Sequence, residues 1–224
     1  MSNYGLLING ELVKSDMTLD VINPATEEVF TQVPRADEAM LDQAVAGAKV
    51  AAAKWSLTDI DERKALIHKI ADAINANIEP LAKALTQEQG KPLAAATMEV
   101  QYAEIFCRYF TSLNLENEVL VDDENQRVEV QRTPLGVVAG ILPWNFPLLI
   151  GIYKIAPSIL AGNSIILKPA PTTPVVSVML GEILKDVVPA GLVNILVDDN
   201  DLGPKITSHP GIDKISFTGS TPTG

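Results

Sequence analysis

The residues best suited to chemistry stand in a short turn in the second half of the chain. Residues 143–147 read PWNFP, so that two prolines bracket Trp144, Asn145 and Phe146. Proline fixes its own φ and restricts the residue before it, which stiffens the turn. A neutral amide held between bulky neighbours that exclude water suits the stabilisation of an oxyanion, and Trp144 suits the wall of a cofactor pocket. The motif alone fits equally well a buried turn in which Asn145 caps the next helix and Trp144 fills the core.

The unusual loops of this half all follow predicted strands. Four short β-rich apolar runs are followed by the loops PWNFP, KPAPTTP, VDDNDLG and FTGSTPTG. Segments with helical period or helix-start signals lie between these runs. Alternating strands and helices predict βαβ units and a parallel sheet buried on both faces. Because open α/β sheets bind ligands at the carboxyl ends of their strands, we expect the four loops to form one site. The strand order stays open.

Two of these loops carry groups that suit a nucleotide. Residues 217–224 are mostly small and are expected to start a helix, whose free N–H groups attract phosphate, although the G-x-G-x-x-G fingerprint is missing. Lys168 directly follows a strand and precedes Pro169, so it could reach a phosphate or a ribose hydroxyl. The alternative for Lys168 is a solvated lysine at a strand end.

The single cysteine and the two histidines are poor catalytic candidates. Cys107 lies inside a predicted helix without an accompanying base, which favours a structural thiol. His68 and His209 lack metal-ligand spacing, so structural roles are favoured and no metal site is predicted.

The sequence pattern of the first half of the chain predicts short strands followed by three helices. Asn9-Gly10 indicates a hairpin, and a helix is expected from Asp37. Thr58 and Asp61 predict a capping box for a second helix, which Pro80 should kink or break. A third helix is expected to carry on one side Met98, Tyr102, Ile105, Tyr109 and Leu113.

The sequence pattern changes at residues 118–133, where two short strand-like runs flank the acidic turn DDEN. This pattern predicts a β-hairpin with two different faces. A lone two-stranded hairpin is barely stable in water, so it should pack on another surface. A partner subunit is one candidate.

Composition excludes several classes of function. The chain has 224 residues and a formal net charge of -11, which disfavours nucleic acid as a partner because polyanions would be repelled. Its start lacks the basic and apolar regions of a signal peptide, and no apolar run is long enough to span a membrane. We therefore expect a cytoplasmic protein with no membrane partner.

Taken together, the motifs resemble the N-terminal part of an NAD(P)-dependent aldehyde dehydrogenase. The resemblance runs over essentially the whole sequence and includes NPAT (23–26), EQGKP (88–92), PLGVVAGILPWNFPL (134–148), KIAPSILAGNSIILKPA (154–170), PAGLVNIL (189–196) and HPGIDKISFTGSTPTG (209–224). It implies an incomplete α/β fold of the aldehyde dehydrogenase type: a Rossmann-like parallel sheet with helices on both faces, N-terminal helices and a protruding hairpin. It also implies a coenzyme-binding domain formed by residues 1–117 and 134–224, an oligomerisation hairpin at 118–133, and a catalytic domain absent from this chain.

The resemblance implies a role for each matching residue. Asn145 would be an oxyanion donor, Lys154 a proton relay, and Lys168 a contact to the adenosine ribose. The positions that match the cofactor cleft are Ile141, Leu142, Pro143, Trp144, Lys168, Ala170, Gly203, Phe217, Thr218, Gly219 and Ser220. Those that match the substrate tunnel are Phe146, Ile150 and Tyr153.

Three departures from the family pattern matter. The nucleophilic cysteine and the general-base glutamate are not present in this sequence, so the chain alone should not oxidise aldehydes. Pro171 stands where a ribose-binding glutamate is common, so the cofactor is NAD or NADP on this evidence. Asp198-Asp199-Asn200 replaces a glycine-rich loop; if the carboxylates face the site, they would repel a 2′-phosphate and slightly favour NAD.

Two interpretations of the whole chain follow. In the favoured one it is a fragment of an enzyme that acts on a small-molecule aldehyde and forms a homodimer or homotetramer when complete. In the other it is a naturally short, non-catalytic module for nucleotide binding or assembly.

Overall fold

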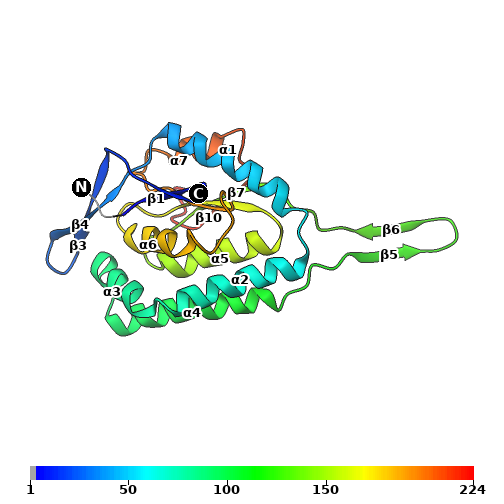
Figure 1. Cartoon of the computed structure of the whole chain (residues 1–224), viewed down its shortest axis with the longest axis horizontal. Helices are drawn as coiled ribbons and strands as arrows, with labels where there is room; N and C mark the ends of the chain where they lie inside the picture. Colours follow the sequence, from blue (N-terminus) through cyan, green and yellow to red (C-terminus); the bar gives the residue numbers. More distant parts are fainter. Residues whose placement is uncertain (1–3) are drawn as a thin grey trace.

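The computed structural model describes residues 4–224, so the first three residues of the expected coenzyme-binding segment lie outside the described part. A six-stranded sheet forms the centre, in the order β10-β7-β8-β9-β1-β2. Figure 1 shows β1, β7 and β10 of this sheet among the helices. Its four parallel strands are β7 (Val137–Ile141), β8 (Ser164–Lys168), β9 (Val193–Ile195) and β10 (Lys214–Phe217). These are the four apolar runs predicted as strands, which confirms the parallel α/β sheet.

Two antiparallel strands, β1 (Leu6–Ile8) and β2 (Glu11–Val13), extend the sheet beyond β9. Asn9 and Gly10 join them with φ of 53° and 83°, the left-handed values that a two-residue hairpin turn requires. The Asn9-Gly10 hairpin is thereby confirmed. A separate two-stranded sheet pairs β3 (Thr18–Asn23) with β4 (Glu28–Pro34).

Helices cover both faces of the sheet, as expected. In β8, Ile165 and Leu167 belong to a core shared with α2 (Ile60–Asn75), α4 (Leu93–Thr111), α5 (Pro147–Leu160) and α6 (Val175–Leu184). Ile166 belongs to a second core shared with α1 (Glu38–Trp55) and α7 (Gly203–Ser208). Successive side chains of a strand point to opposite faces, so a strand between two cores is apolar along its whole length.

The helix start at Asp37 is confirmed, because its carboxylate accepts the backbone N–H of Met40 at 2.8 Å. The predicted capping box is wrong. The N-cap of α2 is Asp59, which makes no side-chain cap bond, and the Thr58 hydroxyl instead donates backwards to the Trp55 carbonyl at 2.8 Å. The following helix does break, since α2 ends at Asn75 and Pro80 lies in the first turn of α3 (Ile78–Gln89), where proline is tolerated.

The aromatic and aliphatic side of α4 faces outwards. Met98, Tyr102, Ile105 and Tyr109 are among the exposed large apolar side chains, whereas the buried face carries Ala96, Glu99, Val100, Ala103 and Cys107. The helix therefore buries its smaller side chains, where it packs against α2, α3 and α5.

The hairpin of β5 (Glu118–Asp122) and β6 (Arg127–Val130) is confirmed as a two-stranded antiparallel unit. It extends away from the rest of the molecule, at the right of Figure 1. None of the helices within residues 4–224 is long and apolar enough to cross a membrane.

Candidate functional site

The sheet order creates a topological switch point beside β7. The chain passes from β7 to β8 on one side, and β10 later returns to pair with the other side of β7. The turn 142–146 and the segment 218–224 leave the carboxyl ends of these two neighbouring strands. In open α/β sheets ligands bind at the carboxyl edge where the direction of the connections reverses.

The turn that carries Asn145 is anchored at its start by Leu142, whose N–H donates to the Lys168 carbonyl at 2.9 Å. The expectation that bulky neighbours exclude water is wrong for this chain, because Trp144, Asn145 and Phe146 are all exposed, Trp144 by 59%. The alternative of a core tryptophan and a capping asparagine is also wrong. Phe146 is the N-cap of α5 and makes no side-chain cap bond, and the Asn145 amide bonds to no other residue of 4–224.

Lys154 joins α5 to the end of β10. Its Nζ donates to Ser216 Oγ at 3.0 Å and to Thr218 Oγ1 at 2.9 Å, and the side chain is buried. Burial lowers the pKa of Lys154 from its usual value, because desolvation disfavours the ammonium form. A lysine with a lowered pKa exchanges protons more readily near neutral pH.

The segment after β10 lies directly beside the turn, since Thr218 N–H donates to the Ile141 carbonyl at 3.1 Å. Gly219 sits over the ring of Phe217, where an added Cβ would lie 2.5 Å from Cζ. The helix expected to start near Ser220 is not formed within the described residues, where 221–223 make a single turn.

Lys168 is not a solvated lysine, so that alternative is wrong. Its side chain is buried, and Nζ bonds Asp198 Oδ1 at 2.6 Å. Asp198 is itself fully buried, and its second oxygen accepts the N–H of Leu202, which precedes Gly203 at the start of α7. Ala170 is half-buried in the loop after β8.

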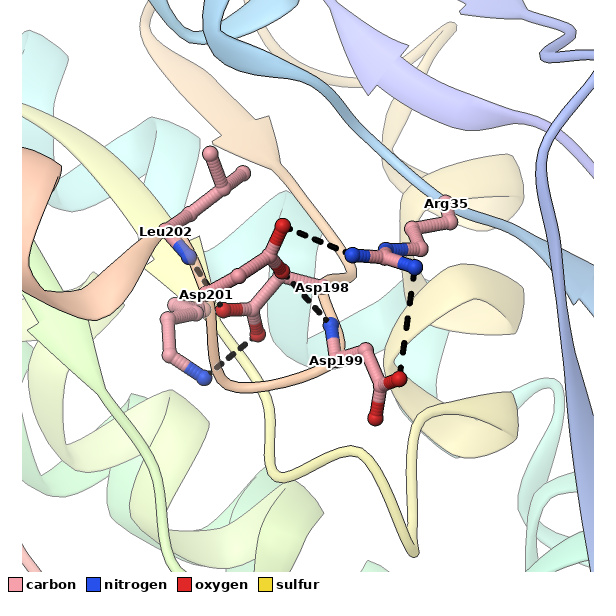
Figure 2. A network of polar contacts seen from close by, with 6 residues as sticks. Arg35, Asp198, Asp199, Asp201 and Leu202 are labelled. Carbon is pink, nitrogen blue, oxygen red and sulfur yellow. Dashed lines mark hydrogen bonds and ion pairs between the residues drawn. The ribbon is translucent and has the colours of Figure 1, made fainter.

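The other acidic side chains of this loop bind an arginine from a distant part of the chain. Figure 2 shows Arg35, in the connection between β4 and α1, beside Asp199 and Asp201. Its Nη2 donates to Asp201 Oδ2 at 2.7 Å, and Nη1 lies 3.9 Å from Asp199 Oδ2. The acidic charges are thus paired rather than free. Sequence reasoning missed Arg35, because nothing local links it to residues more than 160 positions away.

The three residues expected in a substrate tunnel lie on one element, at Phe146 and in the first two turns of α5. Phe146 is exposed, Ile150 and Tyr153 are half-buried, and Tyr153 packs edge-on against Phe106 of α4 with 4.5 Å between ring centroids. Sequence reasoning also missed Lys91, which donates to the Asn145 carbonyl, and Glu99, which accepts the N–H of Leu148 at the start of α5.

Cys107 is fully buried, and burial raises the pKa of its thiol to about 12. The thiolate is the reactive form of cysteine, so this residue is a structural thiol, as the sequence indicated.

Comparison with known proteins gives a consistent result. The model of the aldehyde dehydrogenase family matches residues 12–224. The aldehyde dehydrogenase LUC3 of Fusarium sp. is 39% identical over 218 residues, which are 97% of this chain and 46% of LUC3. The chain therefore spans about half the length of this relative.

Solved structures agree with the sequence match. A betaine aldehyde dehydrogenase variant from Staphylococcus aureus, in complex with NAD+, superposes with a TM-score of 0.93 at 30% identity over 100% of this chain and 47% of its own. An NADP-dependent enzyme of E. coli gives a TM-score of 0.93 at 33% identity over 98% of this chain and 47% of its own. With the fold, the loops at the switch point and the family model in agreement, the chain belongs to the aldehyde dehydrogenase family.

Proposed function

We propose that this chain is the coenzyme-binding part of an NAD(P)-dependent enzyme that oxidises an aldehyde to a carboxylic acid through a cysteine thioester. The observation that carries the proposal is that Lys154 and Thr218 bond to each other at the end of β7, where the Asn145 turn begins at the switch point. Residues 1–117 and 134–224 would bind the coenzyme, and 118–133 would form the oligomerisation hairpin. The nucleophile and the general base would come from a part of the enzyme outside this sequence.

In this mechanism a thiolate attacks the aldehyde carbon, and the carbonyl π electrons move onto oxygen. The Asn145 amide would donate a hydrogen bond to that oxygen and so lower the energy of the tetrahedral state. When bound, NAD(P) supplies the acceptor for the hydride that leaves the same carbon. Hydrolysis of the resulting thioester by water releases the acid and restores the thiol. Lys154, with its lowered pKa, would relay a proton near Thr218.

The donors at the edge of the sheet fit a dinucleotide. Lys168 keeps a small exposed area at the edge of the sheet, where its ammonium would donate to a ribose hydroxyl, and the fully buried Asp198 holds this ammonium in place. The backbone N–H groups of Gly219 and Ser220 and the hydroxyls of Thr218 and Ser220 suit the pyrophosphate. The neighbouring walls would be Ile141, Leu142, Pro143, Trp144 and Phe217. Ala170 and Gly203 would flank the adenosine end.

NAD is the favoured cofactor over NADP. Asp198 holds a carboxylate against Lys168, and Arg35, the cation beside this loop, is already engaged by Asp199 and Asp201. A 2′-phosphate would therefore meet the exposed carboxylates of Asp199 and Asp201 and find Arg35 already bound to them. Phe146, Ile150 and Tyr153 would line the path of the aldehyde.

Two measurements test the proposal. In the complete enzyme, Asn145→Ala should lower kcat by about 10²–10³ because one oxyanion donor is lost. In the 224-residue chain, calorimetric titration with NAD should show binding that Lys168→Met weakens at least tenfold, about 1.4 kcal/mol. The control Lys83→Met removes a lysine from an exposed ion pair on α3 and should bind NAD as the wild type does. An Asn145→Ala enzyme with wild-type kcat would refute the catalytic role, and equal binding by Lys168→Met would refute the ribose role.

A further inference from the structure

The start of α5 is capped by a side chain from another helix. Glu99 of α4 is 1% exposed, and its Oε1 accepts the N–H groups of Leu148 at 3.1 Å and Leu149 at 3.2 Å. The first N–H groups of a helix have no partner within it, and here the N-cap residue Phe146 supplies none. A carboxylate at this end also interacts favourably with the helix dipole. Glu99 thus joins the beginning of α5 to α4.

A second charged side chain contacts the turn itself. Lys91, in the connection between α3 and α4, donates from Nζ to the Asn145 carbonyl at 2.8 Å and also binds the second carboxylate oxygen of Glu99. The same ammonium lies 4.2 Å from the centroid of the Phe146 ring, within the range of a cation–π interaction. Lys91 therefore contacts both Asn145 and the residue after it.

These contacts supply what the two prolines of the turn cannot. Proline fixes its own φ and biases the residue before it, but it leaves the backbone dihedrals of Asn145 free. A hydrogen bond to the Asn145 carbonyl restrains ψ of this residue. The bonds of Glu99 to Leu148 and Leu149 restrain the chain on the other side of Pro147.

We infer that Lys91 and Glu99 are positioning residues that hold the Asn145 turn in the orientation its amide needs. The inference rests on the proposed role of Asn145 as an oxyanion donor. Such donors act when they are already placed about 2.7–3.1 Å from the oxygen position, and displacement by about 1 Å can cost 10²-fold in rate. Both charges lie almost wholly inside the protein, so removal of either partner leaves the other buried and poorly compensated.

The turn contains its own spectroscopic reporter. Trp144 is 59% exposed and precedes Asn145, whereas the other tryptophan, Trp55, is buried and donates from its ring to the Ile159 carbonyl. Fast depolarisation of tryptophan fluorescence in the 224-residue chain therefore reports the mobility of the turn. Lys91→Met should increase this fast component, Lys91→Arg should restore most of the wild-type value, and the control Lys83→Met should leave it unchanged.

Urea unfolding of each variant separates a mobile turn from a general loss of stability. If Lys91→Met does not fold, Glu99→Gln provides the test, because it keeps an acceptor for the N–H groups of Leu148 and Leu149 but loses the charge that binds Lys91. A folded Lys91→Met or Glu99→Gln chain with wild-type depolarisation would overturn the inference.

Kinetics of the complete enzyme distinguish this inference from the proposed function. Lys91→Met should lower kcat by about 10²-fold, with KM for NAD within about threefold of wild type, because the turn and not the nucleotide contact is disturbed. In a double-mutant cycle, adding Lys91→Met to Asn145→Ala should cause little further loss, since both changes remove the same donor. Multiplicative losses would refute the inference while leaving the role of Asn145 intact. A normal kcat in Asn145→Ala alone would refute the proposed catalytic role of Asn145, on which the inference rests.

Discussion

At the scale of single residues, the chemistry of a side chain depends on partners that are far away in the sequence. Lys168 looks like a surface lysine in its local context, yet it is buried against Asp198. Glu99 looks like an ordinary helix glutamate, yet it caps another helix. The identity of such residues is visible in the sequence, but their environment is not, because it is produced by packing between elements.

Glu88 shows the same effect on the pKa of a carboxyl group. It is 3% exposed and accepts the N–H groups of Val175 at 2.6 Å and Val176 at 3.0 Å at the start of α6. Burial raises the pKa of Glu88 to about 8, although the two backbone hydrogen bonds act in the opposite direction. The folded chain therefore retains a proton, from about pH 4.5 to 8, that the unfolded chain releases.

The proton that Glu88 retains in the folded chain leads to a prediction for the pH dependence of stability. The contribution of Glu88 is fully present below the unfolded pKa and is lost as pH rises through the folded pKa, with a slope of up to about 1.4 kcal/mol per pH unit. Relative to Glu88→Gln, which cannot titrate, the wild type should lose stability between pH 5 and 8 in urea unfolding. Glu79→Gln, an exposed change on the same helix, should not alter this slope, because Lys83 lowers the pKa of Glu79. Parallel profiles for wild type and Glu88→Gln would contradict the prediction.

At the scale of elements, side chains from neighbouring helices and connections position the loops and helix starts at the edge of the sheet. The α3–α4 region supplies two carboxylates, Glu88 and Glu99, that cap α6 and α5 respectively. The loop between β9 and α7 is tied to the β4–α1 connection by Arg35 and Asp201 (Figure 2). Each loop at the carboxyl edge of the sheet is thus held by an element outside the sheet.

The loop after β9 gives a prediction about cofactor choice. Asp199→Asn with Asp201→Asn should free the Arg35 guanidinium, which suits bidentate binding of phosphate. We expect the affinity of the chain for NADP relative to NAD to rise at least tenfold, measured by calorimetry. A control with the same charge change, Asp186→Asn with Glu124→Gln, should keep the wild-type ratio if the effect is local. An unchanged ratio in the Asp199 and Asp201 variant would show that this network does not discriminate between the cofactors.

Element prediction from the sequence succeeded where a local signal had one available partner, and failed where two partners compete or where packing decides the outcome. The Asn9-Gly10 turn and the cap at Asp37 form as predicted, because each is completed within a few residues. The Thr58 capping box does not form, because its hydroxyl finds the nearer carbonyl of Trp55. The large apolar side chains of α4 have helical spacing, but spacing alone does not say which face meets the core.

At the scale of the whole molecule, exposed apolar side chains gather on α4 and on the β5–β6 hairpin. The exposed side of α4 carries Met98, Tyr102, Ile105 and Tyr109, and the hairpin exposes Val119, Leu120, Val128 and Val130. Exposed apolar side chains in such groups are typical of interaction surfaces. The proposed oligomerisation role of residues 118–133 is consistent with this exposure.

The hairpin surface gives the prediction at this scale. Replacing its four exposed apolar residues by threonine keeps β propensity but removes apolar area, so self-association of the chain should weaken by at least tenfold. Sedimentation across a range of protein concentrations measures this change, and NAD binding should remain as in the wild type. Ile22→Thr with Val29→Thr, at exposed apolar positions of the β3–β4 sheet, is the matched control. If the hairpin variant and the control associate equally, the hairpin does not mediate assembly.

The sequence by itself determined the strands, the loops that follow them, the hairpin and the family, because these depend on residue types at short spacing. Only the tertiary structure decided the strand order, and with it the switch point between β7 and β10. It also decided the partners of the charges: Lys168 pairs with a residue 30 positions away, Glu99 caps a helix 49 positions away, and Arg35 binds an aspartate 166 positions away. The physical reason is that a local sequence pattern indicates which face of an element is apolar. Buried charges, in contrast, find their partners only when the elements pack together.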